Sequence, residues 1–141
     1  MHGTMFFFGK LQNSSDVVTA DDVQGILRPS KSPWSSSIHL VEKKDGTWFV
    51  FGDLRRLNAV TVLDKYHLPH IQEFSMELNG KTTFSILDVV KAYNQIPVNP
   101  ADIETTVVTT PIGIFEYNTM PFALRNAGQT FQRLWMTFHV S

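Results

Sequence analysis

The sequence predicts an α+β fold that contains a β-hairpin, short antiparallel strands and packed helices. An Asp45-Gly46 dipeptide, which favours tight hairpin turns, lies between two segments rich in β-branched and aromatic residues. Short runs of the same composition recur between residues 83 and 118. Apolar residues then repeat at helical spacing over the last fifteen or so positions. With 141 residues and 43% hydrophobic content, the chain is long enough for one core.

The sequence of residues 1–33 predicts little regular structure. We expect residues 1–24 to be a divergent leader whose end, Thr19-Ala-Asp-Asp22, starts a short helix, because Thr19 can cap its first turn. Gly25 is expected to end that helix. Residues 28–33 are predicted to be extended, since each of their two prolines excludes helical geometry for the residue before it.

The middle of the chain predicts a hairpin followed by a helix. Residues 38–41 are expected to pair with residues 47–51 through a type I′ turn at Asp45-Gly46. Residues 70–78 are expected to be helical and to stop before Gly80. The apolar stripe of that helix comprises Ile71, Phe74 and Leu78.

The last third predicts short strands and a closing helix. We expect strands at residues 83–87, 96–98, 105–110 and 114–118, because each is short and rich in β-branched or aromatic residues. The apolar face of the closing amphipathic helix comprises Ala127, Phe131, Leu134, Trp135 and Phe138.

Charge is distributed unevenly along the chain. The net charge is −1, but residues 25–66 hold seven Lys or Arg against four Asp or Glu. This basic segment favours contact with an anionic partner, although paired surface cations such as Arg55-Arg56 are also common on solvated faces. The absence of cysteine excludes thiolate chemistry and disulfides, which fits an intracellular protein. No apolar run approaches the roughly 20 residues that span a bilayer, so we expect no membrane segment.

One carboxylate stands out as a candidate for metal chemistry. Asp88 directly follows the predicted strand 83–87 and precedes a turn at residues 91–93. A carboxylate at the end of a strand can hold a divalent metal, while the next turn presents backbone N–H groups to phosphate. The alternative is that Asp88 is an ordinary turn or capping residue.

Five further segments make the pattern around Asp88 specific. They are Gly25 to Trp34, Lys43 to Trp48, Gly52 to Asn58, Tyr66 to His70 and Met120 to Asn126. In their order and spacing, they resemble the fingers and first palm segments of reverse transcriptases from gypsy-type long-terminal-repeat retrotransposons. The resemblance covers residues 25–133 and implies a partial reverse transcriptase domain, with residues 134–141 as the divergent end of the last helix. It also implies a fingers hairpin, a partial antiparallel palm sheet and packed helices, in a truncated domain.

The resemblance implies template-directed deoxynucleotidyl transfer on an RNA or DNA template–primer. Asp88 would be the catalytic carboxylate and one of the ligands to Mg²⁺. The family's Tyr-x-Asp-Asp motif, which supplies the other carboxylates, does not occur in the 141 residues. We therefore expect a catalytically incomplete fragment with weak or absent Mg²⁺ binding, since a lone carboxylate binds this ion weakly.

The resemblance also assigns contacts to the incoming deoxynucleotide and to the template. Arg55 and Asn58 fall at template-contacting positions. Phe49 stands where the family commonly has an arginine, and Ala123 where it usually has glycine, so both departures weaken the expected triphosphate site. Tyr93 is the candidate for discrimination of the sugar, with a core position as the alternative, and Phe122 is as readily explained as a core residue. The nucleotide-binding positions are Lys43, Lys44, Lys91, Ala92, Tyr93 and Phe122.

Three functions stay open at this stage. The first, which we favour, is that the chain is an inactive fragment of a retrotransposon polymerase. The second is that it is a module that gains its missing carboxylates from a continuation or a second chain. The third reading is a non-enzymatic nucleic-acid binder that uses the basic segment. An incomplete palm sheet would also leave an exposed edge through which the chain self-associates.

Overall fold

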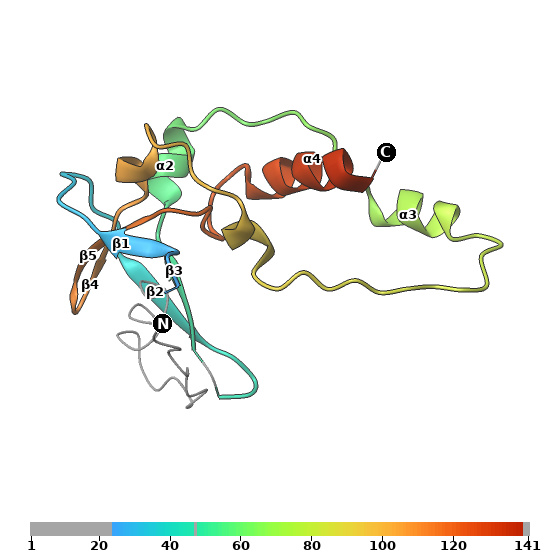
Figure 1. The fold of residues 1–141 in the computed structure, drawn as a ribbon, viewed down its shortest axis with the longest axis horizontal. Coiled ribbons are helices and arrows are strands. Elements are labelled where there is room, and N and C mark those ends of the chain that lie inside the picture. The colour runs from blue at the N-terminus through green and yellow to red at the C-terminus, as the bar shows by residue number, and fades with distance from the viewer. Residues whose placement is uncertain (1–23, 47, 140–141) are drawn as a thin grey trace, which may run out of the picture.

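The computed structural model describes residues 24–46 and 48–139, which form two small sheets, three α-helices and two 3₁₀ helices (Figure 1). The predicted leader, residues 1–24, and the start of its helix lie almost wholly outside this part. Its last residue, Gln24, forms a turn with Gly25, whose φ is 76°. The mixture of helices and antiparallel strands confirms the predicted α+β class.

A three-stranded antiparallel sheet holds the core. Its order is β1 (Leu27–Pro29), β5 (Gly113–Tyr117) and β4 (Val108–Thr110). The sheet joins residues nearly 90 positions apart, because Leu27 lies opposite Tyr117. The buried cluster on this sheet comprises Ile26, Leu27, Val108, Phe115 and Tyr117, with Ile38 and Val50 packed against it.

The predicted hairpin is confirmed as β2 (Ile38–Glu42) paired with β3 (Trp48–Gly52). The predicted type I′ turn is wrong. A type I′ turn needs positive φ at both central residues, but among the described non-glycine residues only Lys91 has positive φ. The N–H of Gly46 donates to the carbonyl of Lys43 at 2.9 Å, and Gly46 alone takes the left-handed conformation. This loop is longer than the two-residue type I′ turn, and it avoids the free-energy cost of placing Asp45 in the left-handed conformation.

Two predicted helices are confirmed and one was missed. The helix α3 (Ile71–Glu77) ends before Gly80, whose φ is 76°, and α4 (Ala127–His139) forms the closing amphipathic helix. The unpredicted helix is α2 (Arg55–Val60), a short element with no side-chain cap. Its six residues are too few to show an amphipathic period.

Two of the predicted strands are wrong. Residues 83–87 are extended but pair with no strand in the described part of the chain. Residues 96–98 form a single bridge, Pro97 with Thr119, rather than a strand. A strand needs a partner of matching register, and proline removes one donor of the ladder.

The region predicted as one strand at residues 105–110 is divided. The 3₁₀ helix η2 (Ile103–Thr106) comes first and β4 follows it. The Thr106 hydroxyl donates to the Ile103 carbonyl at 2.6 Å and accepts the N–H of Tyr117 at 2.9 Å. The helical turn is therefore fastened to β5 by the side chain of a buried threonine. The predicted strand at 114–118 is confirmed as β5.

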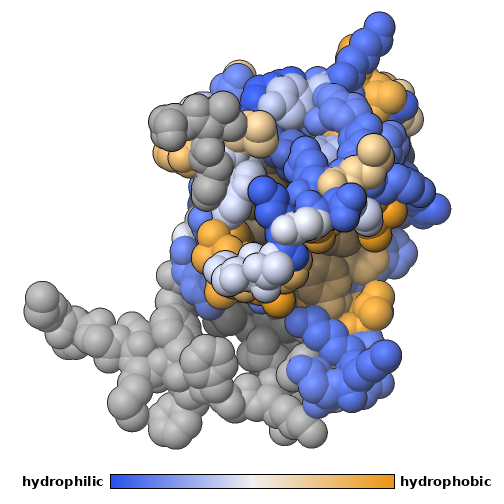
Figure 2. All heavy atoms as spheres, turned by 90° about the vertical axis from the view of Figure 1, so that its right-hand side faces the viewer, coloured by the Kyte–Doolittle hydropathy of each residue, from blue (hydrophilic) through white to orange (hydrophobic). Residues whose placement is uncertain are grey.

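The segment that runs through α3 and residues 78–90 extends away from the sheets (Figure 1). All seven residues of α3 are exposed, and Phe84 and Ile86 are 59% and 97% exposed. Figure 2 shows apolar residues in patches among hydrophilic ones on this side of the molecule. The described helices include none that is long and apolar enough to cross a membrane.

Candidate functional site

A row of seven aromatic side chains, here called the aromatic row, connects the hairpin to the last helix. Successive ring centres are 5.4 to 6.0 Å apart, within the range of favourable aromatic pairs. The row therefore joins elements that the sequence separates by almost 100 residues. In order along the row, its members are His39, Phe51, Phe49, Phe122, Tyr93, Phe131 and Trp135.

The row brings several predicted nucleotide-binding residues together. Tyr93 and Phe122 have ring centres 6.0 Å apart, and Phe122 meets Phe49 edge-on at 5.4 Å. The Lys43 ammonium lies 5.8 Å from the centre of the Phe49 ring, at the range of a cation–π contact. Phe49, at the expected arginine position, thus connects Lys43 to Phe122. Lys44 is exposed in the hairpin loop and is not part of this group.

The turn that carries Tyr93 begins with an unusual backbone conformation. Lys91 has φ 47° and ψ 49°, and the 3₁₀ helix η1 (Ala92–Gln95) follows it directly. A left-handed non-glycine residue costs roughly 1–2 kcal/mol, and such residues cluster at functional turns. The Lys91 ammonium donates to the Gln24 side-chain oxygen at 2.7 Å. The turn therefore directs Tyr93 into the row, while the Lys91 side chain points toward the start of the described chain.

Asp88 lies three residues before this turn, in the extended segment. Its side chain is exposed and makes no hydrogen bond or ion pair with the described residues. No group of three or more His, Cys, Asp or Glu residues within the described ranges is placed to hold a metal. The donor set around Asp88 therefore does not fit a Mg²⁺ site made by these residues alone.

Arg55 is exposed to solvent, but its side chain forms an ion pair with Asp53. Its guanidinium donates to both carboxylate oxygens of Asp53, at 2.8 and 2.6 Å. This bidentate pair holds the pKa of Asp53 well below its ordinary value and raises the pKa of Arg55. His39 approaches the same carboxylate at 3.4 Å. The predicted template contact therefore belongs to a charged cluster at the end of β3.

Asn58 is used as a clamp inside the molecule. Its amide nitrogen donates to the Ala123 carbonyl at 2.8 Å, and its amide oxygen accepts the N–H of Arg125 at 2.9 Å. The Arg125 side chain reaches back to the carbonyls of Asn58 and Thr61, at the end of α2. The loop that carries Phe122 is therefore positioned by α2.

A second set of contacts holds the segment after α2 against α4. Arg133 donates to both oxygens of Asp64, at 3.0 and 2.7 Å, and lies 4.8 Å over the Tyr66 ring. The Tyr66 N–H is the main cause that lowers the pKa of Asp64, and Arg133 adds to it. The side chain of Asn126 bonds to the backbone of Val62 and Asp64. The sequence analysis assigned no role to Asp64, Asn126 or Arg133.

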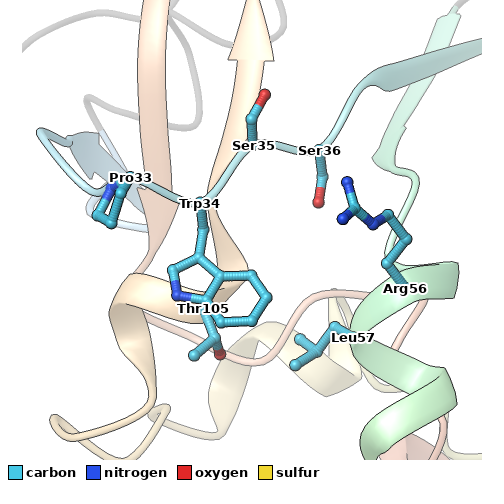
Figure 3. A pocket seen from close by; sticks show the side chains of 7 residues that line it. All are labelled: Pro33, Trp34, Ser35, Ser36, Arg56, Leu57 and Thr105. Atoms are coloured by element: carbon cyan, nitrogen blue, oxygen red, sulfur yellow. The ribbon is translucent and has the colours of Figure 1, made fainter.

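The sequence analysis also missed a groove beside α2. Trp34 and Arg56 line a pocket with Ser35, Ser36 and Thr105 (Figure 3). The adjacent Arg55-Arg56 pair and the Pro-Trp-Ser-Ser-Ser run were the available signals. Only the fold brings these two runs to the same groove.

Comparisons with known proteins show the family of this chain. Residues 41–138 match the family described as Reverse transcriptase (RNA-dependent DNA polymerase). The chain is 37% identical over 115 residues to the retrovirus-related Pol polyprotein from transposon 297 of Drosophila melanogaster. It is 36% identical over 115 residues to that from transposon gypsy of the same species. These alignments cover 78% and 77% of this chain but only 11% of each relative.

The fold has a counterpart among solved structures. The native protease–reverse transcriptase of prototype foamy virus aligns with a TM-score of 0.71 at 20% identity, covering 87% of this chain and 17% of that one. At this identity the likeness supports the fold, and the sequence relatives support the family. The chain therefore belongs to the reverse transcriptase family, and its relatives include retrotransposon Pol polyproteins of the gypsy type.

Proposed function

We propose that the chain is the fingers and first palm part of a retrotransposon RNA-directed DNA polymerase. In this proposal it contacts a template–primer and the incoming deoxynucleotide, and it does not extend a primer by itself. The observation that carries the proposal is the aromatic row, in which Tyr93 and Phe122 are neighbours and Phe122 meets Phe49, the ring that Lys43 contacts. Aromatic faces next to a cation suit a base or sugar with its phosphates.

The chemistry of the carboxylates supports the second half of the proposal. Nucleotidyl transfer needs the attacking and leaving oxygens to be clamped, usually by two metal ions. Asp88 is one exposed carboxylate, and the described residues contain no group of three or more acids, histidines or cysteines placed to hold a metal. Other carboxylates, from outside the described residues, would have to complete the site.

Phe49 weakens the nucleotide site in a way that can be reversed. A phenyl ring offers no donors, whereas a guanidinium offers five in a planar fork that matches phosphate. Phe49 instead fills the space between Lys43 and Phe122. Phe49→Arg is therefore expected to tighten deoxynucleoside triphosphate binding, and Lys43→Gln to weaken it.

Primer extension tests this function directly. The purified chain is mixed with an RNA template annealed to a DNA primer, Mg²⁺ and the four deoxynucleotides, and Asp88→Asn serves as a control for contaminating polymerase. We expect the template–primer to bind and the primer to stay unextended. Templated extension that disappears in Asp88→Asn would overturn the inactive-fragment proposal. Absence of any template–primer binding would overturn the proposed contact with a template–primer.

The exposed segment of residues 78–90 supports a further part of the proposal, self-association. Its backbone pairs with no strand in the described part of the chain, and its apolar side chains face solvent. Unpaired extended segments of this composition associate readily with one another.

A further inference from the structure

An apolar pocket of about 410 Å³ lies between α2, η2, residues 96–98 and the start of α4. It shares no residue with the aromatic row, with Asp88 or with the predicted template contacts Arg55 and Asn58. Pockets of this volume are of the size that holds a small molecule. The apolar part of its lining includes Leu57, Val60, Ile96, Val98, Met120 and Leu124.

One wall of this pocket is held together by backbone hydrogen bonds. The N–H of Met120 donates to the Ile96 carbonyl at 2.7 Å, and the N–H of Val98 donates to the Asn118 carbonyl at 2.9 Å. Met120 itself is only 5% exposed. Because the two segments are already joined, a ligand meets a wall that needs little ordering, which lowers the free-energy cost of binding.

Three threonines of the pocket have already used their hydroxyl protons. Each hydroxyl donates to the backbone carbonyl three or four residues before it, at 2.6 to 2.8 Å. Because a hydroxyl has one proton, none of the three can donate to a ligand without losing that bond. Neither Lys nor Arg occurs among the described residues that line the pocket, so a phosphate finds no cationic partner there. The three threonines are Thr61, Thr105 and Thr106.

A single carboxylate gives the pocket its charge. Of the described residues that line it, only Asp102 carries a charge. Asp102 is exposed, and its carboxylate makes no hydrogen bond or ion pair with any described residue. The Asp102 backbone is fixed, since its carbonyl accepts the N–H of Thr105 at 3.0 Å. A positively charged amine is the partner that suits this carboxylate.

We propose that this pocket binds a small molecule in which an apolar body carries one positively charged amine. The apolar body contacts Leu57, Val98 and Met120, and the amine pairs with Asp102. Apolar burial supplies most of the affinity, and the ion pair selects the amine over a neutral ligand of the same shape. The site goes beyond the proposed function and does not depend on it, because it includes none of the residues assigned to template, primer or nucleotide.

Isothermal titration calorimetry of the whole chain with two ligands of similar shape tests this proposal. 1-Naphthylmethylamine is positively charged at neutral pH, and 1-naphthalenemethanol has a neutral hydroxyl in place of the amine. We expect the amine to bind at one site, up to about fivefold more tightly than the alcohol, which is the scale of one exposed ion pair.

Asp102→Asn should bind the two ligands with equal affinity, because it keeps the size of the side chain and removes its charge. Glu77→Gln is the matched control, since it removes an exposed carboxylate from α3, outside the pocket, and should keep the preference for the amine. Equal affinities in the wild type would overturn the pairing with Asp102. A preference that persists in Asp102→Asn would overturn it as well.

Two exposed valines test whether the ligands occupy the pocket. Val60 lines it and is 74% exposed, whereas Val62 is 86% exposed and lies outside the lining. We expect Val60→Ser to weaken both ligands by about threefold, because it removes apolar contact area, and Val62→Ser to weaken neither. Thermal unfolding without ligand should change little in both variants, since neither replacement leaves a cavity.

Ile86→Ser tests whether the ligands attach instead to the exposed apolar segment of residues 78–90. We expect it to bind both ligands as the wild type does. Loss of binding in Ile86→Ser, or equal losses in Val60→Ser and Val62→Ser, would show attachment to exposed apolar surface and overturn the pocket. The absence of saturable binding of either ligand to the wild type would overturn it too.

Discussion

Neighbouring residues of the same type have different roles in this molecule. Arg55 is held in a bidentate pair with Asp53, and Arg56 next to it is left with its donors available to a ligand. Asn58 falls at a position where the resemblance implies template contact, and in the structure it joins α2 to the loop that carries Phe122. The role of a polar side chain here is set by whether a second segment supplies its partner.

Replacing Asn58 with aspartate should loosen the loop that carries Phe122. The new carboxylate oxygen would face the carbonyl of Ala123, which accepts a hydrogen bond from Asn58 in the wild type. We expect a loss of about 1–3 kcal/mol in the free energy of unfolding, because a partly buried carbonyl oxygen loses its donor and faces a negative charge. Urea unfolding measures the change. Asn79→Asp, at an exposed position after α3, should shift the midpoint little, and equal shifts in both variants would contradict the clamp.

Glu116 should make the stability of the sheet depend on acid. The Ser30 hydroxyl at 2.6 Å, and then Arg28 at 2.7 Å, lower the pKa of Glu116 from its ordinary value of 4.5, against the opposing effect of burial. A group whose pKa is lower in the folded chain than in the unfolded chain stabilises the fold fully at pH values above its unfolded-state pKa. That stabilisation is lost as the pH falls through its folded-state pKa. The free energy of unfolding should therefore decrease below about pH 4.5, because Glu116 binds a proton in the unfolded chain at a higher pH than it does in the folded chain.

Glu116→Gln isolates this contribution. The variant cannot titrate at residue 116, so its unfolding free energy should fall less steeply than that of the wild type between about pH 4.5 and pH 3. Its stability at neutral pH should be lower, since the charge-assisted bonds to Ser30 and Arg28 are weakened. Parallel pH profiles for the two proteins would rule out the proposed linkage.

At the scale of elements, the two sheets meet at a point where no side chain fits. Gly52 ends β3, and a Cβ built on it would lie 2.6 Å from Cγ1 of Val108 in β4. The hairpin can therefore approach the three-stranded sheet only because residue 52 lacks a side chain. The same hairpin is connected to η1 and α4 by the aromatic row.

Gly52→Ala should destabilise the junction between the sheets by about 1–3 kcal/mol, because the added methyl forces the buried Val108 to move. Gly128→Ala is the matched control in α4. Its new Cβ would lie 3.6 Å from Leu68 Cδ1, an ordinary contact, and alanine favours helix over glycine by up to about 1 kcal/mol. Chemical unfolding should move in opposite directions for the two variants. A stable Gly52→Ala protein would show that the junction has room to relax.

At the scale of the whole molecule, the sheets bury apolar side chains in a core, whereas the segment through α3 and residues 78–90 forms no buried core. The apolar faces of α3 and of this segment are exposed together. Burial of apolar area stabilises by about 25 cal/mol per Å², so such surface favours contact with another chain or another segment.

We expect the chain to associate increasingly with concentration, and Ile86→Ser to reduce that association. Ile86 is 97% exposed, so its replacement removes apolar surface without creating a cavity. Analytical ultracentrifugation over a concentration series measures the change, and thermal unfolding of dilute samples should be unaffected. Lys81→Ser alters an exposed polar position in the same segment and should leave association as it is. Monomeric behaviour of the wild type at all concentrations would contradict this prediction.

The sequence by itself determined the family, the α+β class, the hairpin and the helices α3 and α4. These features depend on periodicity, turn residues and ordered motifs, which are encoded within short stretches. It also predicted a set of nucleotide-binding residues, of which Tyr93 and Phe122 are neighbours in the aromatic row and Lys43 contacts Phe49 of that row.

Only the tertiary structure decided which extended segments became strands and which polar groups found partners. Residues 83–87 have the composition of a strand, but a ladder needs a second chain segment at the right register. Three features depend on residues distant in sequence or on side-chain direction. They are the difference in hydrogen-bond partners between Arg55 and Arg56, the clamp made by Asn58, and the position of Phe49 between Lys43 and Phe122. Such contacts depend on how the chain returns on itself, which local patterns do not encode.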